Sequence, residues 1–188
     1  MRAVVVYESL WGNTAAVAGA IAEGIGPEAR TLSTAQATAA EIEGAGLIVA
    51  GGPVLAFHLS AERMRESIRE RPEPGAPPAD LTHPSLRSWL DTLAAGQAWF
   101  GAFDTQVRGP FGKGAPTIAK ALAAKGYRQA ADPEGFVVGG KYGPLLPGEL
   151  DRARRWGDPD QSRRFHLRHD AGDFHGHRGE RSHDAQPQ

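Results

Sequence analysis

The stretch AVVVYESLWGNTAAVAGAIAEGI, residues 3–25, decides the class of fold. It begins with β-branched and aromatic residues in an unbroken run, which is typical of a buried parallel strand. Farther along, Val17, Ile21 and Ile25 recur at the spacing of one helix face, and Asn13 or Thr14 is placed to open that helix. A buried strand followed closely by a helix predicts the first βα unit of an α/β protein.

The same alternation continues to the end of the apolar part of the chain. Further strands are expected at 29–32, 47–50, 98–103 and 136–138, and helices at 38–43, 60–70, 85–93, 116–125 and 148–156. We expect the run Gly51-Gly52-Pro53 to end the third strand and Ser60 to cap the helix after it. Apolar strands separated by helices predict a doubly wound parallel sheet, with ligands bound at the carboxyl ends of its strands.

Composition narrows the classes of function. The 188 residues contain no cysteine, which excludes disulfides, cysteine-ligated metals and thiol catalysis. Lys and Arg total 21 against 22 acidic residues, so no nucleic-acid partner is expected. No apolar run approaches the roughly 20 residues that span a bilayer, and the apolar N-terminus is too short for a signal peptide. We therefore expect a cytoplasmic protein without membrane insertion.

The chain divides by composition into a body, residues 1–157, and a tail, residues 158–188. The tail carries five of the seven histidines and almost no aliphatic side chains, so we expect it to be disordered. Histidine-rich tracts bind Zn²⁺ or Ni²⁺ weakly, and a solvated polar tail is the alternative. We predict no defined metal site.

The loop after the first strand predicts an anion site. Small and hydroxyl-bearing residues at the start of a helix expose backbone amides at the positive end of the helix dipole. The loop has no lysine and lacks Gly-x-Gly-x-x-Gly, so a single phosphate suits it better than a triphosphate or a dinucleotide. An ordinary turn capped by Asn13 is the alternative. The predicted contacts are Ser9, Leu10, Trp11, Gly12, Asn13 and Thr14.

This loop resembles the phosphate loop of the flavodoxin family, Ser/Thr-x-Thr-Gly-Asn-Thr, directly after the first strand. Residues 9–14 match it except at Trp11, where the family commonly has Thr. The resemblance covers roughly residues 1–157 and is strongest to a group near the menaquinone-dependent protoporphyrinogen oxidases. It implies a flavodoxin-like five-stranded sheet in the order 2-1-3-4-5, with helices on both faces, and one FMN as the cofactor.

The resemblance also implies two loops that hold the flavin. The first comprises Pro53, Val54, Leu55, Ala56, Phe57 and His58, an apolar stretch that would desolvate the ring. Phe57 is the expected stacking aromatic and His58 the expected contact at the polar edge of the ring. A core position for Phe57 and a surface position for His58 are the alternatives.

The second implied flavin loop comprises Phe103, Asp104, Thr105 and Gln106. Thr105 and Gln106 offer hydrogen bonds without adding charge, and Phe103 offers contact area. Asp104 would repel a phosphate, so we expect its carboxylate to cap loop backbone.

The resemblance implies an FMN-binding flavoprotein in electron transfer, an oxidoreductase if it is an enzyme. It would act on a redox partner protein or on a small-molecule acceptor such as a quinone. The near-neutral charge gives little electrostatic steering and favours the small molecule. A signalling receiver domain is disfavoured because Gly51-Gly52-Pro53 stands where it needs an aspartate. An interaction module that has lost FMN is the other alternative, argued from Trp11, Val54 and Leu55.

Overall fold

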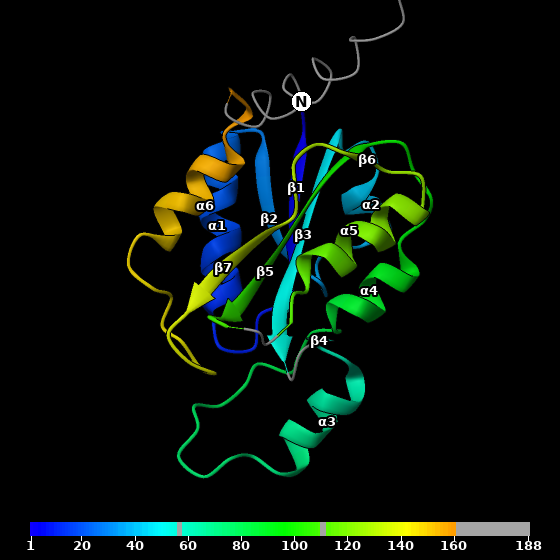
Figure 1. Cartoon of the computed structure of the whole chain (residues 1–188). Helices are drawn as coiled ribbons and strands as arrows, with labels where there is room; N and C mark the ends of the chain where they lie inside the picture. Colours follow the sequence, from blue (N-terminus) through cyan, green and yellow to red (C-terminus); the bar gives the residue numbers. More distant parts are fainter. Residues whose placement is uncertain (56–57, 110–111, 161–188) are drawn as a thin grey trace, which may run out of the picture.

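The computed structural model describes residues 1–55, 58–109 and 112–160. In this part of the chain the sheet has the order β2-β1-β3-β5, and β6 and β7 both pair with the outer edge of β5 (Figure 1). These pairings are parallel, so the predicted order 2-1-3-4-5 is confirmed. The strands are β1 Ala3–Tyr7, β2 Ala29–Ser33, β3 Leu47–Leu55, β5 Trp99–Val107, β6 Arg128–Gln129 and β7 Glu134–Val138. Most of the tail, residues 161–188, lies outside the described residues.

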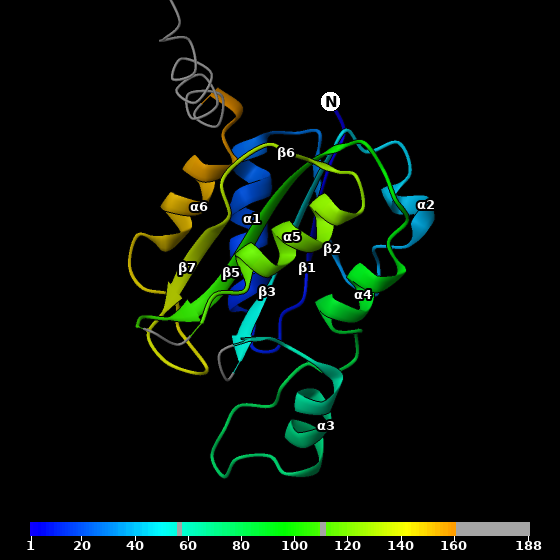
Figure 2. The ribbon, with the colours of Figure 1, turned by 45° about the vertical axis from the view of Figure 1, so that its right-hand side comes forward.

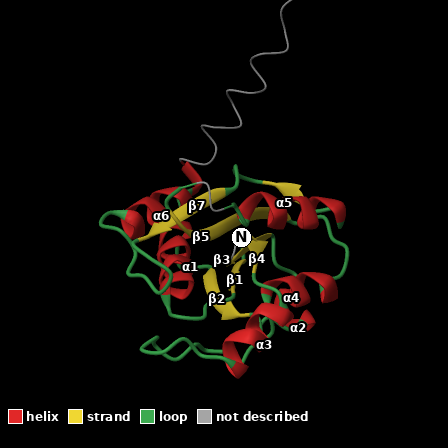
Figure 3. Cartoon of the chain, turned by 60° about the horizontal axis from the view of Figure 1, so that its bottom comes forward, coloured by secondary structure: helices red, strands yellow, loops and turns green. Residues whose placement is uncertain are grey.

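Helices cover both faces of the sheet, as expected (Figures 1 and 2). On one face lie α1 and α6, and on the other lie α2, α4 and α5. The helix α3 lies beyond the carboxyl ends of the strands (Figure 1), on the side of α2 and α4 when the molecule is viewed from those ends (Figure 3). The bounds are α1 Asn13–Ile25, α2 Ala39–Ile42, α3 Glu62–Glu70, α4 Leu86–Thr92, α5 Ala115–Ala124 and α6 Glu149–Gly157.

The core consists of two apolar layers separated by the sheet. Val4 and Val6 of β1 face α4 and α5, while Val5 faces Val17 and Ile21 of α1. Side chains of a strand alternate between faces, so an unbroken apolar strand fills both layers. This pattern fixes the helices on the two faces and leaves the carboxyl ends of the strands open for a site.

Two strands are longer than the sequence predicted. β3 does not end at Gly51-Gly52-Pro53 but continues through them to Leu55, and β5 continues to Val107. Gly51 still pairs with β1, because its carbonyl accepts from the Glu8 amide at 3.0 Å. In a strand, the backbone N–H groups of alternate residues point toward the same neighbouring strand, so the N–H that Pro53 lacks would point to the same side as that of Gly51, toward β1. The pairing with β1 ends at Gly51, so no β1 residue lies opposite Pro53 to accept a hydrogen bond. Proline is therefore tolerated in a strand that is central elsewhere.

The start of α3 also differs from the prediction. Ala61, not Ser60, is the residue before the first turn of the helix, and it makes no side-chain cap. The hydroxyl of Ser60 instead donates to the carboxylate of Glu8 at 2.6 Å. Before α3, a short strand β4, His58–Leu59, pairs antiparallel with the end of β3. After α3, residues 71–85 lead to the start of α4.

Candidate functional site

A cavity of about 460 Å³ lies at the carboxyl ends of β1, β3, β5 and β7. Its walls come from the loop after β1, the extension of β3, α3 and the segment after β7. The volume falls within the range of small-molecule and cofactor sites. Nine of the predicted site residues line it, namely Ser9, Leu10, Trp11, Asn13, Thr14, Pro53, Val54, Leu55 and Thr105.

The loop after β1 presents backbone donors without partners. The amides of residues 11–15 have no hydrogen-bond acceptor among the described residues, and Gly12 enters the helix with φ of 87°. That left-handed conformation favours glycine. The Ser9 hydroxyl is buried, the residue being only 6% exposed, and it too lacks a partner in the described chain. Buried polar atoms are normally satisfied, so the Ser9 hydroxyl calls for an acceptor supplied by a ligand. The amides at the start of α1 are open at the cavity and can bind the same anion.

Two threonine hydroxyls join this loop to β5. Oγ1 of Thr14 and Oγ1 of Thr105 lie 2.7 Å apart, and both side chains are buried. One hydroxyl donates to the other, so the accepting hydroxyl keeps its own hydrogen for a further bond. The pair therefore retains at least one donor beside the unpaired amides.

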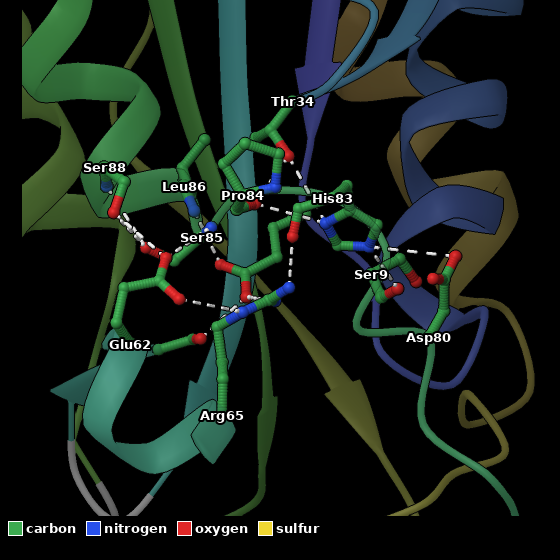
Figure 4. A network of polar contacts seen from close by, with 12 residues as sticks. Ser9, Thr34, Glu62, Arg65, Asp80, His83, Pro84, Ser85, Leu86 and Ser88 are labelled. Atoms are coloured by element: carbon green, nitrogen blue, oxygen red, sulfur yellow. Dashed lines mark hydrogen bonds and ion pairs between the residues drawn. The ribbon is translucent and has the colours of Figure 1, made fainter. Parts of the chain in front are cut away.

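The loop is braced from outside by three hydrogen bonds. The side-chain amide of Asn13 donates to the Tyr142 carbonyl at 3.1 Å, and the backbone N–H of Asp80 donates to the Leu10 carbonyl at 2.8 Å. Nε2 of His83 donates to the Ser9 carbonyl at 3.1 Å (Figure 4). Carbonyls that would repel an anion are thus occupied by protein donors, and Asn13 serves to brace a neighbouring loop rather than as a helix cap.

A buried ion pair joins Glu8, the residue before this loop, to Arg65 of α3 (Figure 4). Nη1 of Arg65 lies 2.6 Å from Oε1 of Glu8, and the two side chains are 1% and 0% exposed. The other carboxylate oxygen of Glu8 accepts from the Leu86 amide at 2.7 Å. Nη2 of Arg65 donates to the His83 carbonyl. This network joins the end of β1 to α3 and to the start of α4.

An adjacent carboxylate caps α4. Oε1 of Glu62 accepts from the Ser85 amide and the Ser88 hydroxyl, each at 3.0 Å. The bond from the Ser85 backbone is the main cause that lowers the pKa of Glu62.

The structure does not bring every predicted side chain to the cavity. Phe103 is fully buried against Phe136, and its ring fills the space where a side chain on Gly51 would lie. The expectation that Phe103 offers contact area to a ligand is therefore wrong. Gln106 lies on the opposite face from Thr105, because successive residues of β5 alternate, and its amide sits over Gly135. His58 is exposed and does not line the cavity, and Ala56 and Phe57 lie outside the described residues.

Asp104 caps backbone, as expected. Its Oδ2 accepts from the amides of Gly114 and Ala115, at 2.7 and 2.8 Å, at the start of α5. Burial raises the pKa of Asp104 to about 6, although these two bonds favour the charged form. Oδ1 has no partner among the described residues. The carboxylate of Asp104 therefore lies on the face of the sheet that α5 covers, away from the cavity.

Six residues that line the cavity were not predicted from the sequence. They are Met64, Ser67, Ile68, Val107, Val138 and Lys141. One signal was available, because Met64 and Ile68 are the only apolar residues of an otherwise polar α3 and stand four apart. No pattern announced the pair between Glu8 and Arg65, since its partners are 57 positions apart.

Two searches of the described residues found nothing. Among residues 1–55, 58–109 and 112–160 there is no group of three or more potential metal ligands. In the same part of the chain, every helix is too short or too polar to cross a membrane.

Comparisons with known proteins identify the fold. No protein-family model and no curated protein matches the chain. A flavodoxin from the domain Archaea has 20% identity and a TM-score of 0.59, over 87% of this chain and 98% of that chain. A WrbA-like flavodoxin from Agrobacterium tumefaciens has 19% identity and a TM-score of 0.52, over 87% and 98%. The flavodoxin of Megasphaera elsdenii has 14% identity and a TM-score of 0.56, over 86% and 98%. These similarities, with the strand order, show the flavodoxin-like fold.

Proposed function

We propose that this chain, which has the flavodoxin-like fold, binds one FMN in the cavity at the carboxyl ends of its strands. The observation that carries the proposal is the buried Ser9 hydroxyl beside the amides of residues 11–15, none of which has a partner within the described part of the chain. A phosphate would accept from these donors without a lysine from the loop. The polar end of the cavity fits FMN, and the resemblance of the loop to the flavodoxin motif supports the same ligand.

The residues of the loop and of the cavity divide between the two ends of FMN. Ser9, Gly12 and Thr14 would hold the phosphate, with Thr105 beside them. The ring would lie among apolar side chains, including Val54, Leu55, Met64 and Ile68. Bound FMN supplies the electron transfer, and the protein supplies orientation and dry walls that set the balance between redox states. Ring contacts by Phe57 and His58 stay predictions.

The acceptor that we propose is a small molecule such as a quinone. The helix α3 adds a wall to the cavity through Met64, Ser67 and Ile68, and this wall would restrict the approach of a large partner. The segment 71–82 continues from α3 beyond the same ends of the strands (Figure 1). The formal net charge of −1 provides little steering toward a basic protein. We infer an FMN-dependent oxidoreductase rather than a diffusible carrier.

The alternative, an interaction module without FMN, loses its main argument. Nε1 of Trp11 donates to the Pro77 carbonyl at 3.2 Å, and the indole packs edge-on against Tyr142 with centroids 4.9 Å apart. These contacts hold the indole at the rim, so the donors of the loop stay free.

The cofactor released by heating the reconstituted protein tests the proposal. We expect one equivalent of FMN by mass spectrometry after incubation with an equal mixture of FMN and FAD. The reduced holoprotein should be reoxidised by a naphthoquinone faster than free FMN is, under anaerobic conditions. Recovery of FAD, or of no flavin, would overturn the proposal of FMN, and reoxidation no faster than that of free FMN would overturn the acceptor alone.

A further inference from the structure

The ion pair between Glu8 and Arg65 is more than a stabilising contact. Two charges that are 0% and 1% exposed cost free energy on burial, and their attraction repays it only where the geometry is good. Here the Glu8 carboxylate accepts three hydrogen bonds, from Arg65, Ser60 and the Leu86 amide. Two hydrophobic side chains could fill the same space with similar stability, so stability alone does not explain a buried ion pair at this place.

That reason lies in how α3 is attached. Arg65 is the only buried residue of α3, and the rest of the helix is exposed or half-buried. Apolar burial therefore does little to dock this helix. The arginine spans from α3 to the end of β1 and to the His83 carbonyl, and so supplies the attachment (Figure 4).

The attachment point is also the root of the loop after β1. Glu8 immediately precedes Ser9 in the chain. His83 contacts both α3 and the loop, because its carbonyl accepts a hydrogen bond from Arg65 and its ring donates one to the Ser9 carbonyl. The residues beside Arg65 on α3, Met64 and Ile68, line the cavity. The network thus attaches the α3 wall to the end of β1, next to the loop, while the ring of His83 holds the loop itself.

We propose that Arg65 is a positioning residue, which through Glu8 holds α3 as the apolar wall of the cavity. This inference rests on the proposed function only in naming the ligand as a flavin. Without the pair, α3 would detach while the sheet and the loop donors remain. The wall would then cover the ring less, and flavins with and without a phosphate would lose the same factor in affinity.

The test without ligand is hydrogen exchange of the full-length chain. In Arg65→Met the amides of 62–70 should exchange at least about tenfold faster, with the amides of α1 unchanged. Arg63→Met, at an exposed position on the same helix, is the matched control and should leave exchange unchanged. Unchanged exchange of 62–70 in Arg65→Met, or a uniform rise throughout the chain, would overturn the proposal.

A second variant separates position from stability. Removing one partner leaves an uncompensated charge, whereas Glu8→Gln with Arg65→Met removes both. We expect the double variant to recover most of the melting temperature that Arg65→Met loses, yet to keep the fast exchange at 62–70. Recovery of slow exchange there would show that packing alone positions α3, and would contradict the proposal.

Flavin binding supplies the third measurement. FMN and riboflavin should each bind Arg65→Met roughly tenfold more weakly than wild type, and iodide should quench the bound flavin more strongly. A loss confined to FMN would assign the effect to the phosphate loop and overturn the proposal. If wild type binds neither flavin while exchange still responds as expected, the proposed function fails and the attachment of α3 stands.

Discussion

At the residue scale, the site depends on polar atoms that the chain itself leaves unsatisfied. The Ser9 hydroxyl is buried without a partner in the described chain, and the hydroxyls of Thr14 and Thr105 keep one free hydrogen between them. An unsatisfied buried donor costs free energy until a ligand accepts from it. The same atoms therefore weaken the empty protein and favour the bound one.

Ser9→Ala should separate these two effects. The variant without ligand should be as stable as wild type or slightly more stable, because no bond within the protein is lost. FMN affinity should fall about ten- to a hundredfold, while riboflavin affinity stays unchanged. Thermal melts and fluorescence titrations measure both, with Thr117→Ala, at an exposed position on α5, as the control. An equal loss for both flavins would contradict a phosphate role for Ser9.

Asp104 predicts a pH dependence of stability. Burial raises its pKa from 3.8 to about 6, so the folded state holds a proton that the unfolded state releases. Stability should therefore fall as the pH rises from about 4 to 6, by at most roughly 3 kcal/mol. Asp104→Asn should remove this fall. Urea unfolding at a series of pH values checks it, with the exposed Asp91→Asn as the control, and identical profiles for wild type and Asp104→Asn would refute it.

At the scale of elements, two helices approach closely because glycine permits it. A Cβ on Gly24 would lie 2.0 Å from the Arg154 carbonyl of α6, and one on Gly157 would lie 2.3 Å from the Ile21 carbonyl of α1. Backbone atoms cannot yield as a flexible side chain can. The contact between α1 and α6 therefore depends on these two positions.

A matched pair of substitutions in α1 tests this contact. Gly24→Ala should destabilise the protein by about 1–3 kcal/mol through overpacking. Gly19→Ala meets nothing within 4 Å and should stabilise it by up to about 1 kcal/mol, since alanine favours the helix. Chemical denaturation of both variants gives the two signs. Destabilisation of equal size at both positions would contradict the account.

Sequence patterns predicted the elements better than their ends. The apolar run of β1 and the helix-period spacing of α1 predicted both elements almost to the residue. The prediction that Gly51-Gly52-Pro53 ends the third strand was wrong, because proline breaks a strand only where a neighbouring strand needs its N–H. The side of the sheet to which residues 103–106 point could not be read before the end of β5 was known. The pair of Glu8 and Arg65 arises only from tertiary structure.

At the scale of the whole molecule, the features that distinguish this chain within the flavodoxin-like fold lie together at the carboxyl ends of the strands. The loop after β1, α3 and the segment after β7 meet there around one cavity. The sequence predicted the place of the cavity, because carboxyl ends of parallel strands share an edge. The sequence did not predict that α3 forms a wall of the cavity. The disorder of the histidine-rich tail stays a prediction from composition.

We propose that FMN binds at the carboxyl ends of the strands through its phosphate. Calorimetric titration of the flavin-free protein with FMN and, separately, with riboflavin tests it most directly. We expect one FMN per chain, bound at least about a hundredfold more tightly than riboflavin, since several donors would face the phosphate. Equal affinities for the two flavins, or no binding of FMN, would contradict it.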